Sequence, residues 1–306
     1  MKHLLSIESM AAEEIRDVLQ LAAVMKSTRG HHDEHPLRHQ CWAMMFSKSS
    51  TRTRISFEVG IRELGGDVLF LNANDIQLGR GEPIKDTARV MGRMLHGAVI
   101  RTFAQSDVVE FAEYGGIPTI NALTDEEHPC QILADLQTIE EKLGSVDGKV
   151  VTFIGDGACN VPTSWMWAAA RLGFELRIAA PRSFQPDAAL LDRLGSADIT
   201  ITDDLEGAVA GADVLYTDVW VSMGREEEAA FRIAQLGKFQ IDSELVAKAK
   251  PGALVMHCLP AYRGKEISEE VFEVHARTIF DQAENRLHAQ KAVLSLLSRS
   301  AKSAAE

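Results

Sequence analysis

The chain has 306 residues, enough for two ordinary domains, and its 46% hydrophobic and 25% charged content is typical of a globular protein. Its formal net charge of -12 argues against nucleic acid as a partner, because phosphate backbones select basic surfaces. It lacks an apolar run of membrane-spanning length and a secretory-type leader, and its four cysteines are widely spaced, so we expect a cytoplasmic protein with reduced thiols and no membrane partner.

Short apolar runs alternate with helical patterns along the whole chain, which is typical of α/β proteins with parallel sheets. In the first half, strands are expected near 41–46, 68–71, 98–102 and 118–121. In the second half, they are expected near 149–154, 175–179, 198–202, 213–217 and 253–257, with a last one near 277–280. Two separate helices are predicted at 129–143, between the halves, and at 284–300, where the last helix begins with Glu284.

The segment from Ser47 to Arg54 (Ser-Lys-Ser-Ser-Thr-Arg-Thr-Arg) follows the first predicted strand and begins a helix. A helix start presents free N–H groups and partial positive charge, and arginine adds a planar fork that matches phosphate oxygens. An acidic protein that binds an anion must also concentrate its positive charge locally. The segment therefore predicts a phosphate site.

Further polar residues lie at strand ends and helix starts. Arg101 ends the third predicted strand, where a buried guanidinium must either form a salt bridge or face a pocket. His128 precedes the helix at 129–143, and Gln131 lies three residues further on, so both side chains face the same end of that helix. Together they could hydrogen-bond a carbonyl or carboxamide. Arg286, in the last helix, supplies another guanidinium.

A glycine-rich turn, Gly155-Asp156-Gly157-Ala158-Cys159-Asn160, follows the strand at 149–154. In a dinucleotide fingerprint a third glycine would stand where this chain has Asn160. Positions 178–180, where a ribose-binding acid is expected, read Ile-Ala-Ala. The pattern therefore disfavours NAD and indicates a turn that exposes Asn160 to a ligand.

Asp218 follows the strand at 213–217 and is itself followed by a small-residue loop through Gly224. An acid in this position could bind a ligand ammonium, and the loop could close as a lid. His257 and Cys258 end the strand at 253–257. Because adjacent strand residues point to opposite faces, the thiol is interpreted as a polar wall of the pocket, not as a nucleophile.

Taken together, these residues resemble the aspartate/ornithine carbamoyltransferase family. Ser50-Thr51-Arg52-Thr53-Arg54 is similar to its carbamoyl-phosphate signature, and His128-Pro129-Cys130-Gln131 to its HPxQ element. Asp218 with Ser222-Met223-Gly224, and then His257-Cys258-Leu259-Pro260, resemble the ornithine branch. The elements occur in the family's order over essentially the whole chain.

We therefore expect two doubly wound parallel-sheet α/β domains joined by a bridging helix, with the C-terminal helix packing back on the first domain. The expected boundaries are 1–147 for a carbamoyl-phosphate-binding domain, 148–282 for an ornithine-binding domain and 283–306 for the returning helix. By the resemblance, the catalytic unit is a homotrimer with shared sites, and neither metal nor cofactor is needed.

The resemblance also implies roles for individual residues. Carbamoyl phosphate would be held by Ser50, Thr51, Arg52, Thr53, Gln77, Arg101, His128, Gln131, Cys258, Leu259 and Arg286, with Gln77 reaching into a neighbouring subunit's site. L-Ornithine would be held by Asn160, Asp218, Ser222 and Met223. The residues expected to be catalytic are Arg52, Arg101, His128, Asp218 and Cys258.

The expected reaction is direct attack by the uncharged side-chain amine of ornithine on the carbonyl of carbamoyl phosphate, which gives citrulline and phosphate through a tetrahedral intermediate. Three alternatives remain open at this point. They are a carbamoyltransferase for another amine acceptor (N-acyl-ornithine, putrescine or aspartate), an NAD-dependent enzyme, and a catalytically silent paralogue. An acceptor panel would test for another amine acceptor. A measurement of NAD binding would test for an NAD-dependent enzyme, and measurable turnover would exclude a silent paralogue.

Overall fold

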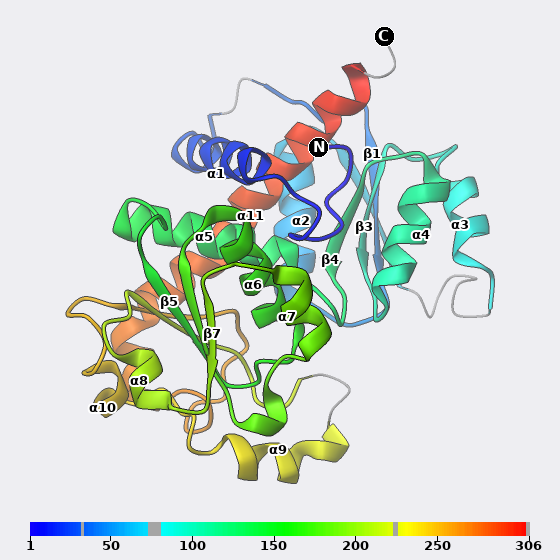
Figure 1. Ribbon diagram of the computed structural model, residues 1–306. Helices are drawn as coiled ribbons and strands as arrows, with labels where there is room; N and C mark the ends of the chain where they lie inside the picture. The colour runs from blue at the N-terminus through cyan, green and yellow to red at the C-terminus, as the bar shows by residue number, and fades with distance from the viewer. Residues whose placement is uncertain (32–33, 73–80, 223–225, 304–306) are drawn as a thin grey trace. The chain divides into compact units, whose positions relative to one another are not determined.

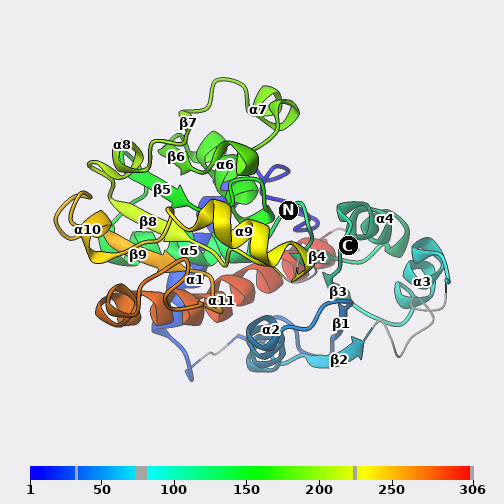
Figure 2. The same ribbon diagram turned by 90° about the horizontal axis from the view of Figure 1, so that it is seen from below.

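A computed structural model describes residues 1–31, 34–72, 81–222 and 226–303 of the chain (Figures 1 and 2). The chain forms two compact units, and each is described by itself. Unit 1 comprises residues 1–137 and 284–306, and unit 2 comprises residues 138–283. The division falls inside two helices, α5 (Pro129–Leu143) and α11 (Glu269–Ser303), so that each unit contains part of both.

Unit 1 is a parallel α/β unit whose four strands lie in the order β2-β1-β3-β4. Its further elements, in chain order, are α1 (Ala12–Ser27), β1 (Cys41–Phe46), α2 (Thr51–Glu63), β2 (Asp67–Asn72), α3 (Ile84–Met91), β3 (Gly97–Arg101), α4 (Gln105–Gly115) and β4 (Thr119–Leu123). Because β1 and β3 are central, they are covered on both faces, which explains why they read as continuous apolar runs.

The sheet of unit 1 is covered by helices on both faces (Figure 1). On one face, Ala43 and Met45 of β1 join a core cluster with Ala88 of α3 and Phe111 of α4. Alternation along the strand turns Trp42 toward the other face. There the indole lies over Gly97 of β3, where an added Cβ would come within 2.4 Å of the Trp42 ring, so the close strand–indole packing requires glycine.

Unit 2 contains a second parallel sheet, with strand order β7-β6-β5-β8-β9. Its elements are β5 (Val150–Ile154), α6 (Asn160–Leu172), β6 (Glu175–Ala179), η3 (Arg182–Phe184), α7 (Ala188–Leu194), β7 (Ile199–Thr202), α8 (Leu205–Val209), β8 (Val214–Thr217), η4 (Glu226–Glu228), α9 (Ala229–Leu236), α10 (Ser243–Val246) and β9 (Leu254–His257). The chain adds β6 and β7 on one side of β5, and then crosses over to place β8 and β9 on the other side. Doubly wound sheets bind ligands at the point where the strand order reverses in this way, here between β5 and β8.

Aromatic packing fixes α6 on the sheet of unit 2. The Trp165 ring meets that of Tyr216 at 5.5 Å between centroids in an edge-on arrangement, and Phe153 stacks on Tyr216 at 5.9 Å. Such pairs add roughly 0.5–1.5 kcal/mol each beyond the burial of their area. The turn that precedes Asn160 is consequently attached to a rigid helix and strand.

The expectation of two parallel α/β domains with a C-terminal helix that packs back on the first is confirmed. Nine predicted strands lie within a residue or two of β1 to β9, and the helix at 129–143 is α5. The strand predicted near 277–280 is wrong, because that segment lies inside α11. For the same reason the last helix does not begin at Glu284 but at Glu269. A short apolar run does not distinguish a strand from one buried face of a helix, and here Ile279 is fully buried while Phe280 is 54% exposed.

The last part of α11 packs against α2 in unit 1. The Lys291 side chain is fully buried and donates to Glu63 at 2.6 Å, and Lys26 of α1 donates to Asn285 at 2.7 Å. Gly60 of α2 faces Lys291 and Leu287, where an added Cβ would lie 3.1 Å from Lys291 Cγ. In the part of the chain that the structure describes, no helix has both the length and the apolar character needed to cross a bilayer.

Candidate active site

The start of α2 in unit 1 presents the segment that the sequence predicts to bind phosphate. Only four residues separate the end of β1 from Thr51, so the first turn of α2 lies at the carboxyl edge of the sheet. Ser50 is the N-cap, and its Oγ accepts from the backbone N–H of Thr53 at 3.3 Å. Arg52 is half-buried, and among the described residues its guanidinium has no hydrogen-bond or ion-pair partner. Thr51 is exposed.

Arg286 of α11 ties this helix start to α5. Its guanidinium is 3% exposed and donates through Nη2 to Thr53 Oγ1 at 3.0 Å and through Nη1 to Gln131 Oε1 at 2.6 Å. The amide of Gln131 in turn donates to Asp135 Oδ1 at 2.8 Å. Hydrogen bonds to charged groups are the stronger ones, so this network holds Thr53, Gln131 and Arg286 in one arrangement.

Arg101 lies at the end of β3 and is only 5% exposed. Within the described parts of the chain its Nε is buried without a hydrogen-bond partner. Burial, together with the neighbouring guanidinium groups of Arg286 and Arg52, lowers the pKa of Arg101 to about 10. Three positive groups therefore converge here, and an anion or a carbonyl oxygen would satisfy the orphaned donor.

His128, which precedes α5, lies against the same cluster. Burial, reinforced by Arg286 and Arg101, lowers the pKa of His128 well below its ordinary value of 6.5. The imidazole is therefore neutral at neutral pH, and a neutral imidazole can donate one hydrogen bond without adding a further charge. Positive groups and a neutral donor together suit an oxygen-rich anion.

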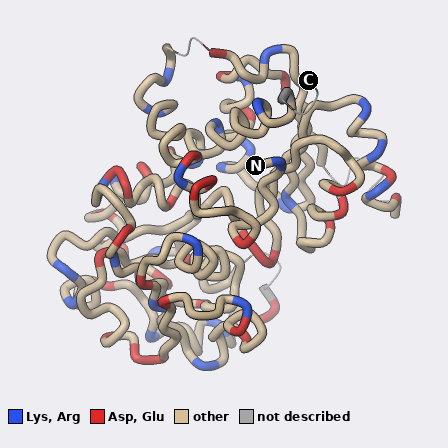
Figure 3. The backbone as a smooth tube through the Cα atoms, turned by 45° about the horizontal axis from the view of Figure 1, so that its top comes forward, with Lys and Arg blue, Asp and Glu red and all other residues tan. Residues whose placement is uncertain are grey.

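These positive groups are clustered in a protein whose overall charge is negative. Figure 3 shows acidic and basic residues interspersed along both units, and the formal net charge is -12. Lys48 is held by an ion pair with Asp125 and lies 4.2 Å from the ring centroid of Phe103. Arg54 lies over the Phe70 ring at 3.9 Å. Both are already engaged, whereas Arg52 and the Nε of Arg101 have no hydrogen-bond or ion-pair partner within the segments that the structure describes.

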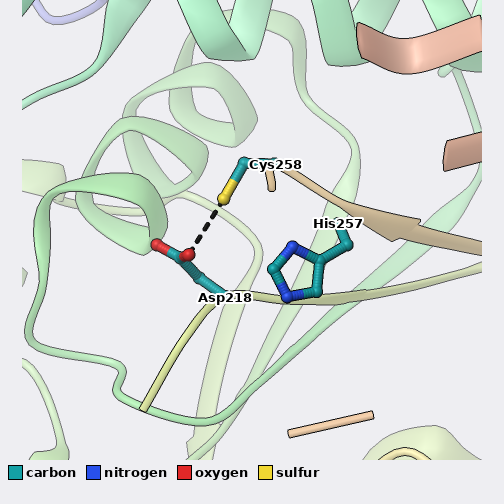
Figure 4. A group of neighbouring side chains, drawn as sticks. All are labelled: Asp218, His257 and Cys258. Atoms are coloured by element: carbon teal, nitrogen blue, oxygen red, sulfur yellow. Dashed lines mark hydrogen bonds between the residues drawn. The ribbon is translucent and has the colours of Figure 1, made fainter. Parts of the chain in front are cut away.

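A second group of predicted residues meets in unit 2, at the ends of β8 and β9 (Figure 4). The Cys258 thiol donates to Asp218 Oδ1 at 2.9 Å, and the Val219 N–H donates to the same oxygen at 2.7 Å. Burial raises the pKa of Asp218 above its ordinary 3.8, although His257, the thiol and the Val219 amide each oppose the shift. A carboxylate that is costly to ionise here would be stabilised by a ligand cation.

The imidazole of His257 is not part of the thiol's hydrogen bond. Its Nδ1 accepts from the Leu259 N–H at 2.9 Å, and its Nε2 lies 3.2 Å from Oε1 of the fully buried Glu266. The ligand atoms of Asp218, His257 and Cys258 lie within 4.8 Å of one another, which is a spacing a metal ion could bridge. Because both imidazole nitrogens are engaged, a metal would have to displace one of these hydrogen bonds.

Asn160 is the first residue of α6 and is half-buried at the same edge of the unit 2 sheet. The preceding turn is held by Asp156, whose Oδ1 accepts from the Ala158 N–H at 3.0 Å and whose carbonyl accepts from the Cys159 thiol at 3.2 Å. Burial, then Asp156 and Asp218, raise the pKa of Cys159 well above 9.0, so this thiol stays protonated.

One buried arginine that the sequence reasoning missed links the two parts of this group. Arg232 of α9 pairs with Asp156, donates through Nε to the Trp220 carbonyl at 2.6 Å and through Nη1 to Glu228 at 3.2 Å. It thereby joins the turn before Asn160 to the segment after Asp218. No local pattern marks it, because its partner lies 76 residues away.

The remaining predicted residues are placed as follows. Ser222 and Leu259 are half-buried, and Leu259 adopts a left-handed backbone with φ of 59°. Gln77 and Met223 lie outside the described residues. The structure therefore brings together Thr53, Arg101, His128, Gln131 and Arg286 with Arg52 in unit 1, and Asp218 with Cys258 in unit 2.

The chain thus consists of two doubly wound α/β units. One carries a guanidinium cluster suited to a phosphorylated compound, and the other carries a buried acid–thiol pair. The chain belongs to the aspartate/ornithine carbamoyltransferase family. Residues 2–141 match the carbamoyl-P binding domain of that family, and residues 147–297 match its Asp/Orn binding domain. The family resemblance read from the motifs is thereby confirmed.

Three similar proteins are all named ornithine carbamoyltransferase. The chain is 58% identical over 299 residues to the ornithine carbamoyltransferase of Akkermansia muciniphila, covering 97% of this chain and 98% of that protein. It is 42% identical to the anabolic ornithine carbamoyltransferase of Campylobacter jejuni, whose crystal structure superposes with a TM-score of 0.92 over 98% of this chain and all of that one. The ornithine carbamoyltransferase of Pyrococcus furiosus gives a TM-score of 0.91 at 43% identity, with 97% of both chains covered.

Proposed function

We propose that the protein transfers the carbamoyl group of carbamoyl phosphate to the side-chain amine of L-ornithine, giving L-citrulline and phosphate. The observation that carries this proposal is the convergence of Arg52, Arg101 and Arg286 around a neutral His128, in the unit that matches a carbamoyl-P binding domain. The names of the relatives support ornithine as the acceptor.

In this proposal the first domain binds the phosphorylated donor. The N–H groups at the start of α2, with Ser50, Thr51, Arg52 and Thr53, hold the phosphate, and Arg286 supplies a second guanidinium. Arg101, His128 and Gln131 receive the carbamoyl end. Arg101 Nε has no protein partner among the described residues, so it is available to the carbonyl oxygen.

The second domain binds the acceptor. Asp218 attracts an ammonium group, because a cation relieves the cost of keeping this buried carboxylate ionised. Asn160 and Ser222 complete this side, with Met223 as a further contact by resemblance. Cys258, hydrogen-bonded to Asp218, lies beside the reacting amine, with Leu259 next to it.

The chemistry requires an uncharged amine, whose deprotonation at neutral pH costs roughly 4 kcal/mol for an alkyl ammonium of pKa near ~10. Asp218 and Cys258 form a short path for that proton. As the amine attacks, negative charge develops on the carbonyl oxygen, and donors from Arg101, Thr53 and His128 stabilise it, each worth about 3 kcal/mol in comparable sites. Binding both substrates in an aligned geometry lowers the barrier further.

The first experiment is an acceptor panel with colorimetric detection of the ureido product. We expect turnover with L-ornithine and at least 100-fold lower kcat/KM with N-acetyl-ornithine, putrescine and aspartate. Arg52→Ala should weaken carbamoyl-phosphate binding by more than ten-fold, whereas Arg182→Ala, which removes an exposed arginine of unit 2, should not. An Arg52→Ala affinity within a few-fold of the parent would falsify the phosphate assignment.

We further propose a homotrimer in which Gln77 contributes to a neighbouring subunit's site, as the family resemblance implies. Sedimentation should give three times the mass of one chain. Mixing Gln77→Ala with Arg101→Ala subunits should restore activity above that of either variant alone, since some sites in the mixed trimers would carry both intact residues. Unshared sites would give no restoration.

A further inference from the structure

Glu127 precedes His128 and does not belong to any motif described above. Its side chain is 3% exposed, although its neighbours Asp125 and Glu126 are exposed. The carboxylate points back to the beginning of the chain, where Oε2 accepts from the Ile7 N–H at 2.8 Å and Oε1 lies 3.3 Å from the Glu8 N. Two backbone amides, 120 and 119 residues away, thus donate to one buried carboxylate.

The segment that supplies these donors is itself fixed to the sheet. Leu4 pairs in parallel with Ile120, with Leu4 N donating to Thr119 O at 2.9 Å and Asn121 N donating to Leu4 O at 2.7 Å. The carbonyl of Leu5 accepts from Asn121 Nδ2 at 2.9 Å. The chain's first residues therefore extend the sheet at β4 and form a rigid base.

The loop that leads to His128 is held at several points. The Glu127 N–H donates to Thr124 Oγ1 at 3.1 Å, and Thr124 N donates to the Glu127 carbonyl at 3.0 Å. Thr124 Oγ1 also donates to Gln105 Oε1 at 2.7 Å. The backbone of Glu127 is thus closed into a tight turn, and its side chain anchors that turn to Ile7.

We infer that Glu127 is a positioning residue for the carbamoyl transfer: by binding the Ile7 and Glu8 amides, it fixes the backbone from which the His128 imidazole projects. The inference rests on the proposed function. A neutral imidazole that must donate to a developing oxyanion is sensitive to displacements of a fraction of an ångström, so its backbone must be held tightly. Charge-assisted hydrogen bonds from two main-chain amides to the buried Glu127 carboxylate hold the backbone in this way.

The test compares Glu127→Ala with Glu126→Ala, a matched control that removes an exposed carboxylate one position earlier. We expect Glu127→Ala to lower kcat for citrulline formation at least ten-fold while KM for ornithine changes less than two-fold. Glu126→Ala should leave both constants within two-fold of the parent. Glu127→Gln retains an acceptor for the Ile7 N–H and should recover part of the lost kcat.

A cycle with His128→Ala separates positioning from a general loss of structure. If Glu127 acts through His128, adding Glu127→Ala to His128→Ala lowers kcat by less than three-fold. A full ten-fold loss in both backgrounds would overturn the inference, as would unchanged kcat in Glu127→Ala.

A spectroscopic readout keeps the inference testable without turnover. In protein labelled at histidine, the ring signal of His128, assigned with His128→Gln, should shift or broaden in Glu127→Ala and not in Glu126→Ala. An unshifted ring signal in Glu127→Ala contradicts positioning. Absence of citrulline from the unmodified protein would overturn the proposed function instead, and the ring signal would still decide the role of Glu127.

Discussion

Arg286 and Thr53 are 233 residues apart in the chain, and Arg286 Nη2 donates to Thr53 Oγ1 across 3.0 Å. The bond joins α11 to the first turn of α2, so α11 completes the turn that we propose binds phosphate. The same guanidinium reaches Gln131, and one side chain thereby aligns three segments of unit 1.

Thr53→Val should weaken carbamoyl-phosphate binding. The substitution keeps the shape of the side chain but removes an acceptor for a charged donor, an interaction worth about 1.5–3 kcal/mol. We therefore expect a rise in Kd of roughly ten-fold or more, measured by calorimetry. Thr200→Val, at an exposed position of β7, is the control and should bind carbamoyl phosphate as the parent does.

Arg101→Met should reduce activity and increase stability at once. Loss of one oxyanion donor corresponds to about 10²–10³ in kcat. Removing a buried guanidinium whose pKa is already lowered to about 10 by burial and by Arg286 and Arg52 relieves repulsion, so Tm should rise. Citrulline assays and calorimetric melting measure the two effects. A fall in Tm would contradict this account of the cluster, and Arg16→Met, on the exposed side of α1, should change neither quantity.

The lowered pKa of His128 predicts how the stability of the protein depends on pH. Its pKa is lower in the folded state than its ordinary value of 6.5, because it is buried beside Arg286 and Arg101, so the unfolded chain binds more protons. Its stabilising contribution is therefore complete above pH 6.5 and is lost as the pH falls below that value. Melting of the parent and of His128→Gln from about pH 7.5 to about pH 5 should show a smaller loss in the variant. Parallel curves would contradict the prediction, and His31→Gln at an exposed position serves as control.

Asp218→Asn tests a pH dependence of stability with the opposite sign to that of His128. Burial raises the pKa of Asp218, so its ionised form opposes folding once the pH exceeds the raised value. The variant should melt at a higher temperature than the parent near about pH 8 and lose this advantage near about pH 4. Ornithine affinity should fall at the same time, because the variant lacks the carboxylate that we propose binds the ligand's ammonium group. Equal melting temperatures at both pH values would contradict the burial argument.

Arg232→Gln should lower the stability of the fold and, of the two substrates, weaken the binding of ornithine only. It leaves Asp156 buried without its partner, which costs about 3–5 kcal/mol of stability, and it frees the Trp220 carbonyl next to the segment that follows Asp218. We expect a higher KM for ornithine with an unchanged KM for carbamoyl phosphate, measured at a temperature where the variant is folded. Arg182→Gln removes an exposed partner of Asp203 and is the matched control.

The amino-acid sequence by itself determined the α/β class, the positions of nine strands and the helix start that carries Ser50 to Arg54. These features depend on local patterns: apolar runs of strand length, capping residues and the spacing of His128 and Gln131 on one helix. The failed strand near 277–280 has the same origin, since a run of four residues contains too little periodicity to reveal a helix that starts at Glu269.

Tertiary structure alone decided which of these groups act on one another. Three contacts show this. Arg286 bonds to Thr53, 233 positions away, and Arg232 pairs with Asp156, 76 positions away. Glu127 accepts from the Ile7 amide, 120 positions away. The lowered pKa values of Arg101 and His128 follow from burial and from neighbouring charges brought by other segments. Short-range patterns set the backbone conformation of each segment, whereas hydrogen bonding and electrostatics depend on distances in space, which exist only once the chain has folded.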